Sequence, residues 1–232
     1  MGKATRYGIH HFGLAVGRAC IPALIALALV GTPASAETQE EVPEIAATGY
    51  AADDSVFASP FIDADEMRGE GDTAYRYIHG GFTGTDTRFA YYFPMADQWD
   101  GRFFQYVTPV PDSEMLSEGL TGEEDRIGMA LDSGAYFVST NGGGPAAAQM
   151  GLGKDQTIGA YRANAAAARF SRHVAAQIYG TDAKIYGYIY GGSGGAYRTI
   201  GSLENSDAWD GAVPYVMGSP MAMPNMFTVR LR

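Results

Sequence analysis

From residue 102 onward, strand-like and helix-like runs alternate along the chain. The strand-like runs are short and rich in aromatic and β-branched residues, and the helix-like runs carry apolar residues at helical spacing. Strands are expected at residues 102–107, 135–140, 184–190 and 212–217, and helices at residues 123–132, 157–179 and 196–204. This alternation predicts an α/β fold with a mostly parallel sheet flanked by helices, because parallel neighbours need a crossover between them.

The longest expected helix, residues 157–179, has a boundary signal at each end. Thr157 can act as the N-cap, because its hydroxyl can accept a backbone N–H bond from the first turn. Gly180 can end the helix in the left-handed conformation that glycine adopts without steric cost. The sequence therefore predicts a single helix between these two residues.

The part of the chain before residue 102 is expected to divide into two regions. Aromatic runs at residues 75–82 and 88–93 flank a turn sequence, which predicts an antiparallel hairpin at one edge of the sheet. Residues 37–71 are rich in Ala, Asp and Glu and show no clear period, so we expect an acidic flexible leader there. The folded domain is accordingly expected to span residues 72–232.

Residues 1–36 are predicted to be a secretory signal. Three basic residues (Lys3, Arg6 and Arg18) occur with no acidic residue, and an apolar run at residues 19–30 is followed by Ala-Ser-Ala at residues 34–36. The apolar run is short for a membrane span, so a cleaved signal is favoured over an N-terminal anchor. The mature protein is therefore expected to be secreted or periplasmic, with no membrane association after cleavage.

Charge and cysteine usage exclude several classes of function. The chain has a net charge of −10, and removing the signal would remove only basic residues. Such a surface repels the phosphates of nucleic acids, so no nucleic-acid partner is expected. Cys20 lies within the signal and is the only cysteine, which excludes thiolate nucleophiles, disulfides and zinc-thiolate sites in the mature protein. No metal or organic cofactor is implied.

The sequence Gly-Gly-Ser-Gly-Gly at residues 191–195 lies directly between an expected strand and an expected helix. A G-x-S-x-G pattern in this context predicts a nucleophile elbow, a sharp strand-to-helix turn that exposes a serine hydroxyl at the top of a parallel sheet. The turn tolerates only small neighbours, and Gly191, Gly192 and Gly195 meet that demand. Ser193 is therefore the predicted catalytic nucleophile.

A phosphate-binding loop and a glycine-rich turn without chemistry are the alternatives for this segment. The dinucleotide fingerprint G-x-G-x-x-G is incomplete, because Tyr197 stands at the third glycine position. The nucleophile elbow is the better match to the surrounding strand and helix.

An oxyanion hole needs two backbone N–H groups near the serine. The first is expected from Gly194, which follows the nucleophile. The second is expected from the loop after the strand at residues 102–107, where Thr108 and Val110 can donate an N–H and Pro109 cannot.

Three segments, at residues 98–107, 130–143 and 187–220, give the chain a resemblance to the tannase and feruloyl esterase group of serine hydrolases. The resemblance implies the α/β-hydrolase fold and hydrolysis of carboxylic esters, so a small-molecule ester is the expected substrate. It also implies a cysteine beside the serine, bridged to one beside the histidine. Here Gly192 occupies the place of that cysteine, so this chain departs from the group at the catalytic serine.

In the α/β-hydrolase fold the serine is followed in the chain by an acid and then by a histidine. The histidines here all precede Ser193, and they are His10, His11, His79 and His173. We interpret His79 as a partly buried hairpin residue and His173 as lying on a solvated helix face.

Asp207 and Asp210 come before the strand expected at residues 212–217, at the end of the sheet away from the serine. We therefore expect a C-terminally incomplete hydrolase domain, whose acid, histidine and last strands lie further along the natural chain. A serine peptidase of the same fold and a non-catalytic binding protein on a hydrolase scaffold remain open.

Overall fold

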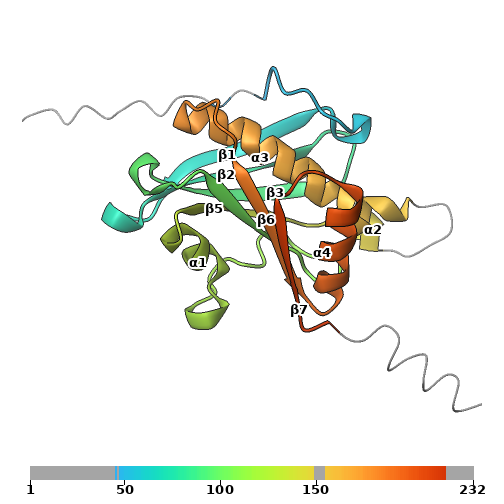
Figure 1. Cartoon of the computed structure of the whole chain (residues 1–232). Helices are drawn as coiled ribbons and strands as arrows, with labels where there is room; N and C mark the ends of the chain where they lie inside the picture. The colour runs from blue at the N-terminus through green and yellow to red at the C-terminus, as the bar shows by residue number, and fades with distance from the viewer. Residues whose placement is uncertain (1–44, 46, 149–154, 218–232) are drawn as a thin grey trace, which may run out of the picture. The chain divides into compact units, whose positions relative to one another are not determined.

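The computed structural model describes residues 45, 47–148 and 155–217, and this part of the chain forms a sheet of seven strands (Figure 1). The predicted signal, residues 1–36, lies outside the described residues. Across the sheet the strand order is β1-β2-β3-β5-β4-β6-β7. The strands are β1 (Pro60–Arg68), β2 (Tyr75–Phe82), β3 (Arg88–Pro94), β4 (Arg102–Tyr106), β5 (Ala135–Thr140), β6 (Tyr186–Gly192) and β7 (Gly211–Tyr215).

The sheet has an antiparallel side and a parallel side. β1, β2, β3 and β5 pair antiparallel in that order, and β4 pairs parallel with both β5 and β6, as β6 does with β7. All strands except β1 and β3 therefore point the same way. This confirms the predicted α/β class, the hairpin formed by β2 and β3, and the parallel strands that follow.

Helices cover the two faces of the sheet. They are α1 (Arg126–Asp132), α2 (Gly144–Ala148), α3 (Ala163–Tyr179) and α4 (Gly194–Asn205). On β5, Tyr136 packs in the same core as α3 residue Phe170, whereas Phe137 packs in the core that contains α1 residue Ala130. Alternate residues of a strand point to opposite faces, so α3 and α1 lie on opposite sides of the sheet. Each fully buried Phe contributes about 1.5–3 kcal/mol relative to an exposed one.

The structure corrects the predicted flexible leader at residues 37–71. Residues Pro60–Arg68 of this segment form β1, which pairs with β2 along its length. The acidic residues of β1 are compatible with a strand because cationic partners lie opposite: Arg76 of β2 donates two bonds to Asp65, at 2.6 and 2.7 Å. Composition alone does not show such cross-strand pairing.

The structure also corrects the start of the helix predicted at residues 157–179. Thr157 is helical and makes no side-chain cap bond, and its own N–H donates to the carboxylate of Asp155 at 2.9 Å. A π-helical turn, Ile158–Arg162, then leads into α3. The C-terminal end is confirmed, because Gly180 adopts a left-handed conformation with φ of 58°.

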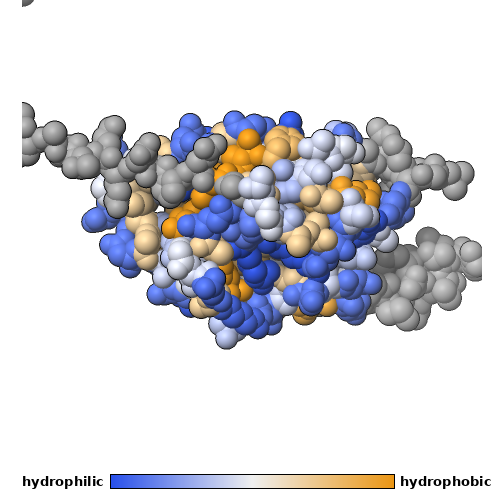
Figure 2. Space-filling model, turned by 90° about the horizontal axis from the view of Figure 1, so that it is seen from above, coloured by the Kyte–Doolittle hydropathy of each residue, from blue (hydrophilic) through white to orange (hydrophobic). Residues whose placement is uncertain are grey.

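The surface seen in Figure 2 is largely hydrophilic, with apolar side chains emerging between polar ones. Tyr188, Val213 and Tyr215 are among the large apolar residues that stay exposed, on β6 and β7. In the part of the chain that the structure describes, no helix combines the length and the apolar character that a membrane crossing requires.

An ion pair joins the N-terminal segment to the entrance of α3, and its removal should destabilise the fold. Arg162 donates two bonds to Asp54, at 2.6 and 2.8 Å, and these bonds lower the pKa of the Asp54 carboxyl below its usual value. Both side chains are mostly buried. We expect Asp54→Asn to lower the free energy of unfolding by about 1–2 kcal/mol at pH 7, measured by urea denaturation.

The stability difference between wild type and Asp54→Asn should depend on pH, and its direction follows from the lowered pKa of Asp54. A carboxyl whose pKa is lower in the folded state stabilises the protein above its unfolded pKa, and that stability is lost as the pH falls through the folded pKa. The difference between wild type and Asp54→Asn should therefore be constant near neutral pH and shrink below about pH 4. Asp53→Asn is the control, because Asp53 pairs with Arg169 while largely exposed, so we expect a change within about 0.5 kcal/mol. Equal effects of the two variants would contradict the assignment.

Candidate active site at the carboxyl ends of the parallel strands

Ser193 lies at the junction of β6 and α4, with no loop residue between them. Its backbone has φ of 56° and ψ of −118°, a conformation that costs a non-glycine residue about 1–3 kcal/mol. Among the described non-glycine residues, only Val216 also has a positive φ. The Ser193 side chain is exposed. A strained turn that lifts a serine above the carboxyl end of a parallel sheet is the arrangement of the α/β-hydrolase fold.

The elbow, residues 191–195, packs against the backbone of the segment that follows β4. A Cβ atom on Gly191 or Gly195 would come closer than 3.0 Å to the carbonyl oxygen of Val107, and one on Gly194 would come within 2.7 Å of the carbonyl oxygen of Pro109. Real Cβ atoms essentially never approach other atoms so closely. Glycine is therefore required here by close approach of two backbones.

On the opposite side, the elbow is held by the neighbouring strand β7. The N–H of Ser193 donates to the carbonyl oxygen of Tyr215 at 3.2 Å. A Cβ atom on Gly192 would lie 2.7 Å from the Tyr215 ring. The serine backbone is thus fixed from both sides, which places its hydroxyl reproducibly.

The structure brings Gly194 and residues 108–110 together, as the sequence predicted. Gly194 is the first residue of α4, where a backbone N–H has no acceptor within the helix. Thr108 is buried, and its hydroxyl donates to the carbonyl oxygen of Val110, which shapes the segment. Val110 itself is 62% exposed. The assignment of Thr108 and Val110 as oxyanion donors stays a prediction.

The loop after β5 also reaches this edge of the sheet. A Cβ atom on Gly142 would lie 3.3 Å from the Cα of Pro111 and 2.5 Å from Nη2 of Arg198. The segments after β4 and β5 therefore meet around the side chain of Arg198, which belongs to α4. Sequence reasoning missed Arg198; its only sequence signal is its place in the second turn of the helix that follows the elbow.

Arg198 is an unusual cation because, among the residues that the structure describes, its polar contacts are with uncharged oxygens. It donates to the carbonyl oxygen of Thr108 at 2.8 Å and to that of Gly159 at 2.6 and 3.0 Å. Burial lowers the pKa of its guanidinium to about 10, so the group stays charged at neutral pH. It adds a fixed positive charge beside the loop that contacts the elbow.

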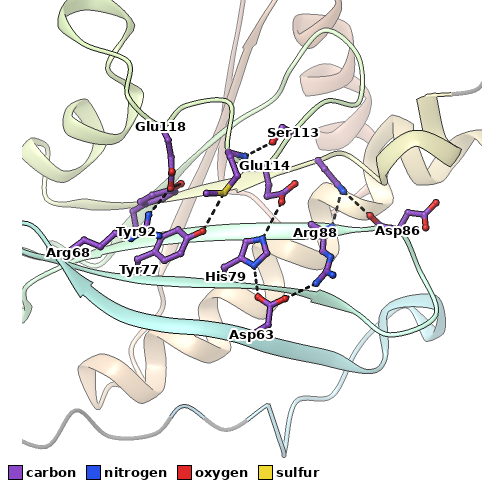
Figure 3. A network of polar contacts seen from close by, with 12 residues as sticks. Asp63, Arg68, Tyr77, His79, Asp86, Arg88, Tyr92, Ser113, Glu114 and Glu118 are labelled. Carbon is purple, nitrogen blue, oxygen red and sulfur yellow. Dashed lines mark hydrogen bonds and ion pairs between the residues drawn. The ribbon is translucent and has the colours of Figure 1, made fainter.

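His79 belongs to a polar network around the hairpin (Figure 3), and the strand order places it away from the elbow. Its Nδ1 contacts Asp63 at 2.5 Å and its Nε2 contacts Glu114 at 3.2 Å. β3, β5 and β4 separate β2 from β6, which corresponds to roughly 19 Å between those two strands. His79 is thus a hairpin residue with structural partners.

The same network fixes the far part of the long segment between β4 and α1. Figure 3 shows Glu118 beside Arg68 and Tyr92, with contacts of 2.8 and 2.9 Å. The hydroxyl of Tyr77 contacts the sulfur of Met115 at 3.3 Å. The segment between β4 and α1 therefore contacts the elbow at its start and is tethered to β1, β2 and β3 further along.

The other candidate residues lie at different places. His173, expected on a solvated face, is partly buried on α3 with its ring near those of Tyr50 and Phe170, at 5.6 and 6.0 Å between centroids. Asp210 accepts the N–H of Gly187 near the start of β6, at the end of the sheet away from Ser193, as predicted. Asp207 pairs with Arg169 on α3.

Within the described residues, no group of three or more His, Cys, Asp or Glu side chains could hold a metal ion.

No family model matches the sequence, and no curated protein matches it. Several solved structures resemble part of the chain, and three of them are described here. A tannin acyl hydrolase from Aspergillus niger is 17% identical with a TM-score of 0.46, over 66% of this chain and 31% of that one. The rice cell wall degrading esterase LipA from Xanthomonas oryzae is 11% identical with a TM-score of 0.44, over 66% of this chain and 49% of that one. Candida antarctica lipase A in its closed state is 12% identical with a TM-score of 0.42, over 69% of this chain and 45% of that one. This chain thus spans less than half the length of each.

Proposed function

We propose that the protein is a secreted serine hydrolase that cleaves carboxylic esters through an acyl-enzyme on Ser193. The observation that carries the proposal is the exposed serine on a backbone-strained turn, between the N-terminus of α4 and the segment after β4. A strained conformation persists only where its surroundings enforce it, and such residues concentrate at active sites. The glycine contacts supply that enforcement.

The proposed reaction begins with attack of Ser193 Oγ on the carbonyl carbon of a bound ester. The developing oxyanion accepts hydrogen bonds from the N–H of Gly194 and from the N–H of Thr108 or Val110. The positive end of the α4 dipole favours the same negative charge. The alcohol then leaves, and water hydrolyses the acyl-enzyme to release the acid.

A serine hydroxyl is a weak nucleophile unless a base takes its proton. In the proposed enzyme a histidine, oriented by an acid, accepts the Ser193 proton and returns it to the leaving alcohol. Neither described histidine lies at the elbow, since His79 is on β2 and His173 is on α3. We propose that the acid and the histidine come from a part of the natural protein beyond these residues.

Turnover of two matched substrate classes tests this function. The full-length protein, purified from the exporting host, should hydrolyse p-nitrophenyl esters of short acids and leave peptide p-nitroanilides intact. Comparable turnover of both classes would favour the peptidase. Saturable ester binding without hydrolysis would favour the binding protein.

A further inference from the structure

The side chain of Arg198 joins the helix of the proposed nucleophile to the segment that packs on the elbow. Arg198 is partly buried, and its guanidinium contacts the carbonyl and the hydroxyl oxygens of Thr108 at 2.8 and 3.2 Å. Its other two bonds reach the carbonyl oxygen of Gly159 in the π-helical turn. Arg198 follows Ser193 by five residues on one helix, so the two move together.

The surroundings are arranged to admit this side chain. Gly142 leaves the space that Nη2 occupies, since a Cβ there would lie 2.5 Å from it. Burying a cation without a carboxylate partner costs several kcal/mol, which must be offset by good hydrogen-bond geometry. Arginine suits the position because its planar fork donates in several fixed directions at once, and the single ammonium of lysine does not.

We propose that Arg198 is a positioning residue that holds residues 108–110 against the elbow and so keeps their N–H groups aimed at the oxyanion. The inference rests on the proposed ester hydrolysis at Ser193. Arg198 fixes the carbonyl of Thr108 from α4, and the Thr108 hydroxyl in turn donates to Val110. A misaligned donor loses transition-state stabilisation while ground-state binding of the ester stays the same.

The test compares Arg198→Lys and Arg198→Ala with wild type in the full-length protein. We expect kcat for p-nitrophenyl ester hydrolysis to fall roughly 10- to 100-fold in both variants, with KM within about twofold of wild type. Lysine keeps the charge and loses the fork, so Arg198→Lys should recover only part of the rate lost in Arg198→Ala. Millimolar guanidinium should restore part of the kcat of Arg198→Ala.

Arg172→Lys is the matched control. Arg172 is a mostly buried arginine that also joins two backbone segments, through the carbonyl oxygens of Ile185 at 2.9 Å and Ala208 at 2.6 Å. These segments lie before β6 and β7, at the end of the sheet away from Ser193. We expect this variant to keep the wild-type kcat.

Each result has a defined meaning. Unchanged kcat in folded Arg198→Lys, a change in KM alone, or an equal fall in kcat for Arg172→Lys would overturn the positioning role. Failure of guanidinium to restore any rate to folded Arg198→Ala would also overturn it. If wild type itself neither turns over esters nor reacts with a fluorophosphonate, the proposed function fails and this inference fails with it.

Discussion

Replacing Ser193 by alanine is expected to lower kcat for ester hydrolysis by about 10⁴- to 10⁶-fold. In the proposed mechanism the hydroxyl forms the acyl-enzyme. Without it, the backbone N–H groups of the oxyanion hole can still stabilise negative charge, but no nucleophile remains at the elbow. The side chain is exposed, so its removal should change the free energy of unfolding by less than about 0.5 kcal/mol. Loss of activity without loss of stability separates a catalytic serine from a structural one.

The measurement is the initial rate of p-nitrophenyl ester hydrolysis, with urea denaturation of the same preparations. Ser59→Ala is the control, because Ser59 is an exposed serine beside β1, at the other edge of the sheet. We expect its rate to equal that of wild type. A Ser193→Ala protein that keeps more than a tenth of the wild-type rate would place the nucleophile elsewhere.

The second large effect is expected from Gly195→Ala. The new Cβ would press on the carbonyl oxygen of Val107, inside 3.0 Å, and would lie 3.3 Å from the carbonyl carbon of Thr108. Neither contact is with a flexible side chain, so β4 and α4 must move apart. Overpacking usually costs 1–3 kcal/mol, and we expect about 3 kcal/mol or more where two backbones collide. Ester turnover should fall as well, because residues 108–110 move with β4.

Gly201→Ala is the matched control for this prediction. Gly201 lies in the same helix, and a Cβ there would meet nothing within 4 Å. Alanine has the higher helix propensity, so this variant should be more stable than wild type by about 0.5–1 kcal/mol. Urea denaturation of both variants measures the contrast. A Gly195→Ala protein as stable as wild type would contradict the close backbone contact at the elbow.

Much of the fold was predictable because its signals are local. The aromatic runs of β2 and β3, the alternation of strands and helices after residue 102, and the glycines around Ser193 each act through neighbouring residues. The elbow is the clearest example. A strand is followed directly by five small residues and then by a helix, and this order predicts a sharp strand-to-helix turn.

The features that were missed depend on partners far away in the chain. β1 was hidden because its acidic residues find their polar partners on other strands: Asp63 contacts His79 and Arg88, at 2.5 and 2.9 Å. Arg198 was missed for the same reason, since its acceptors are Thr108 and Gly159. Only the folded sheet brings such groups together, and the hydrophobic periodicity of the sequence does not report contacts between distant residues.

Covalent labelling tests the central claim, the nucleophilic role of Ser193, most directly. The full-length protein would be treated with a fluorophosphonate, digested and mapped by mass spectrometry, with Ser193→Ala treated in parallel. We predict one adduct, on the peptide that contains Ser193, and loss of ester turnover as the adduct forms. We predict no adduct in the variant. An adduct on a different residue, or ester turnover that survives complete labelling of Ser193, would contradict the account.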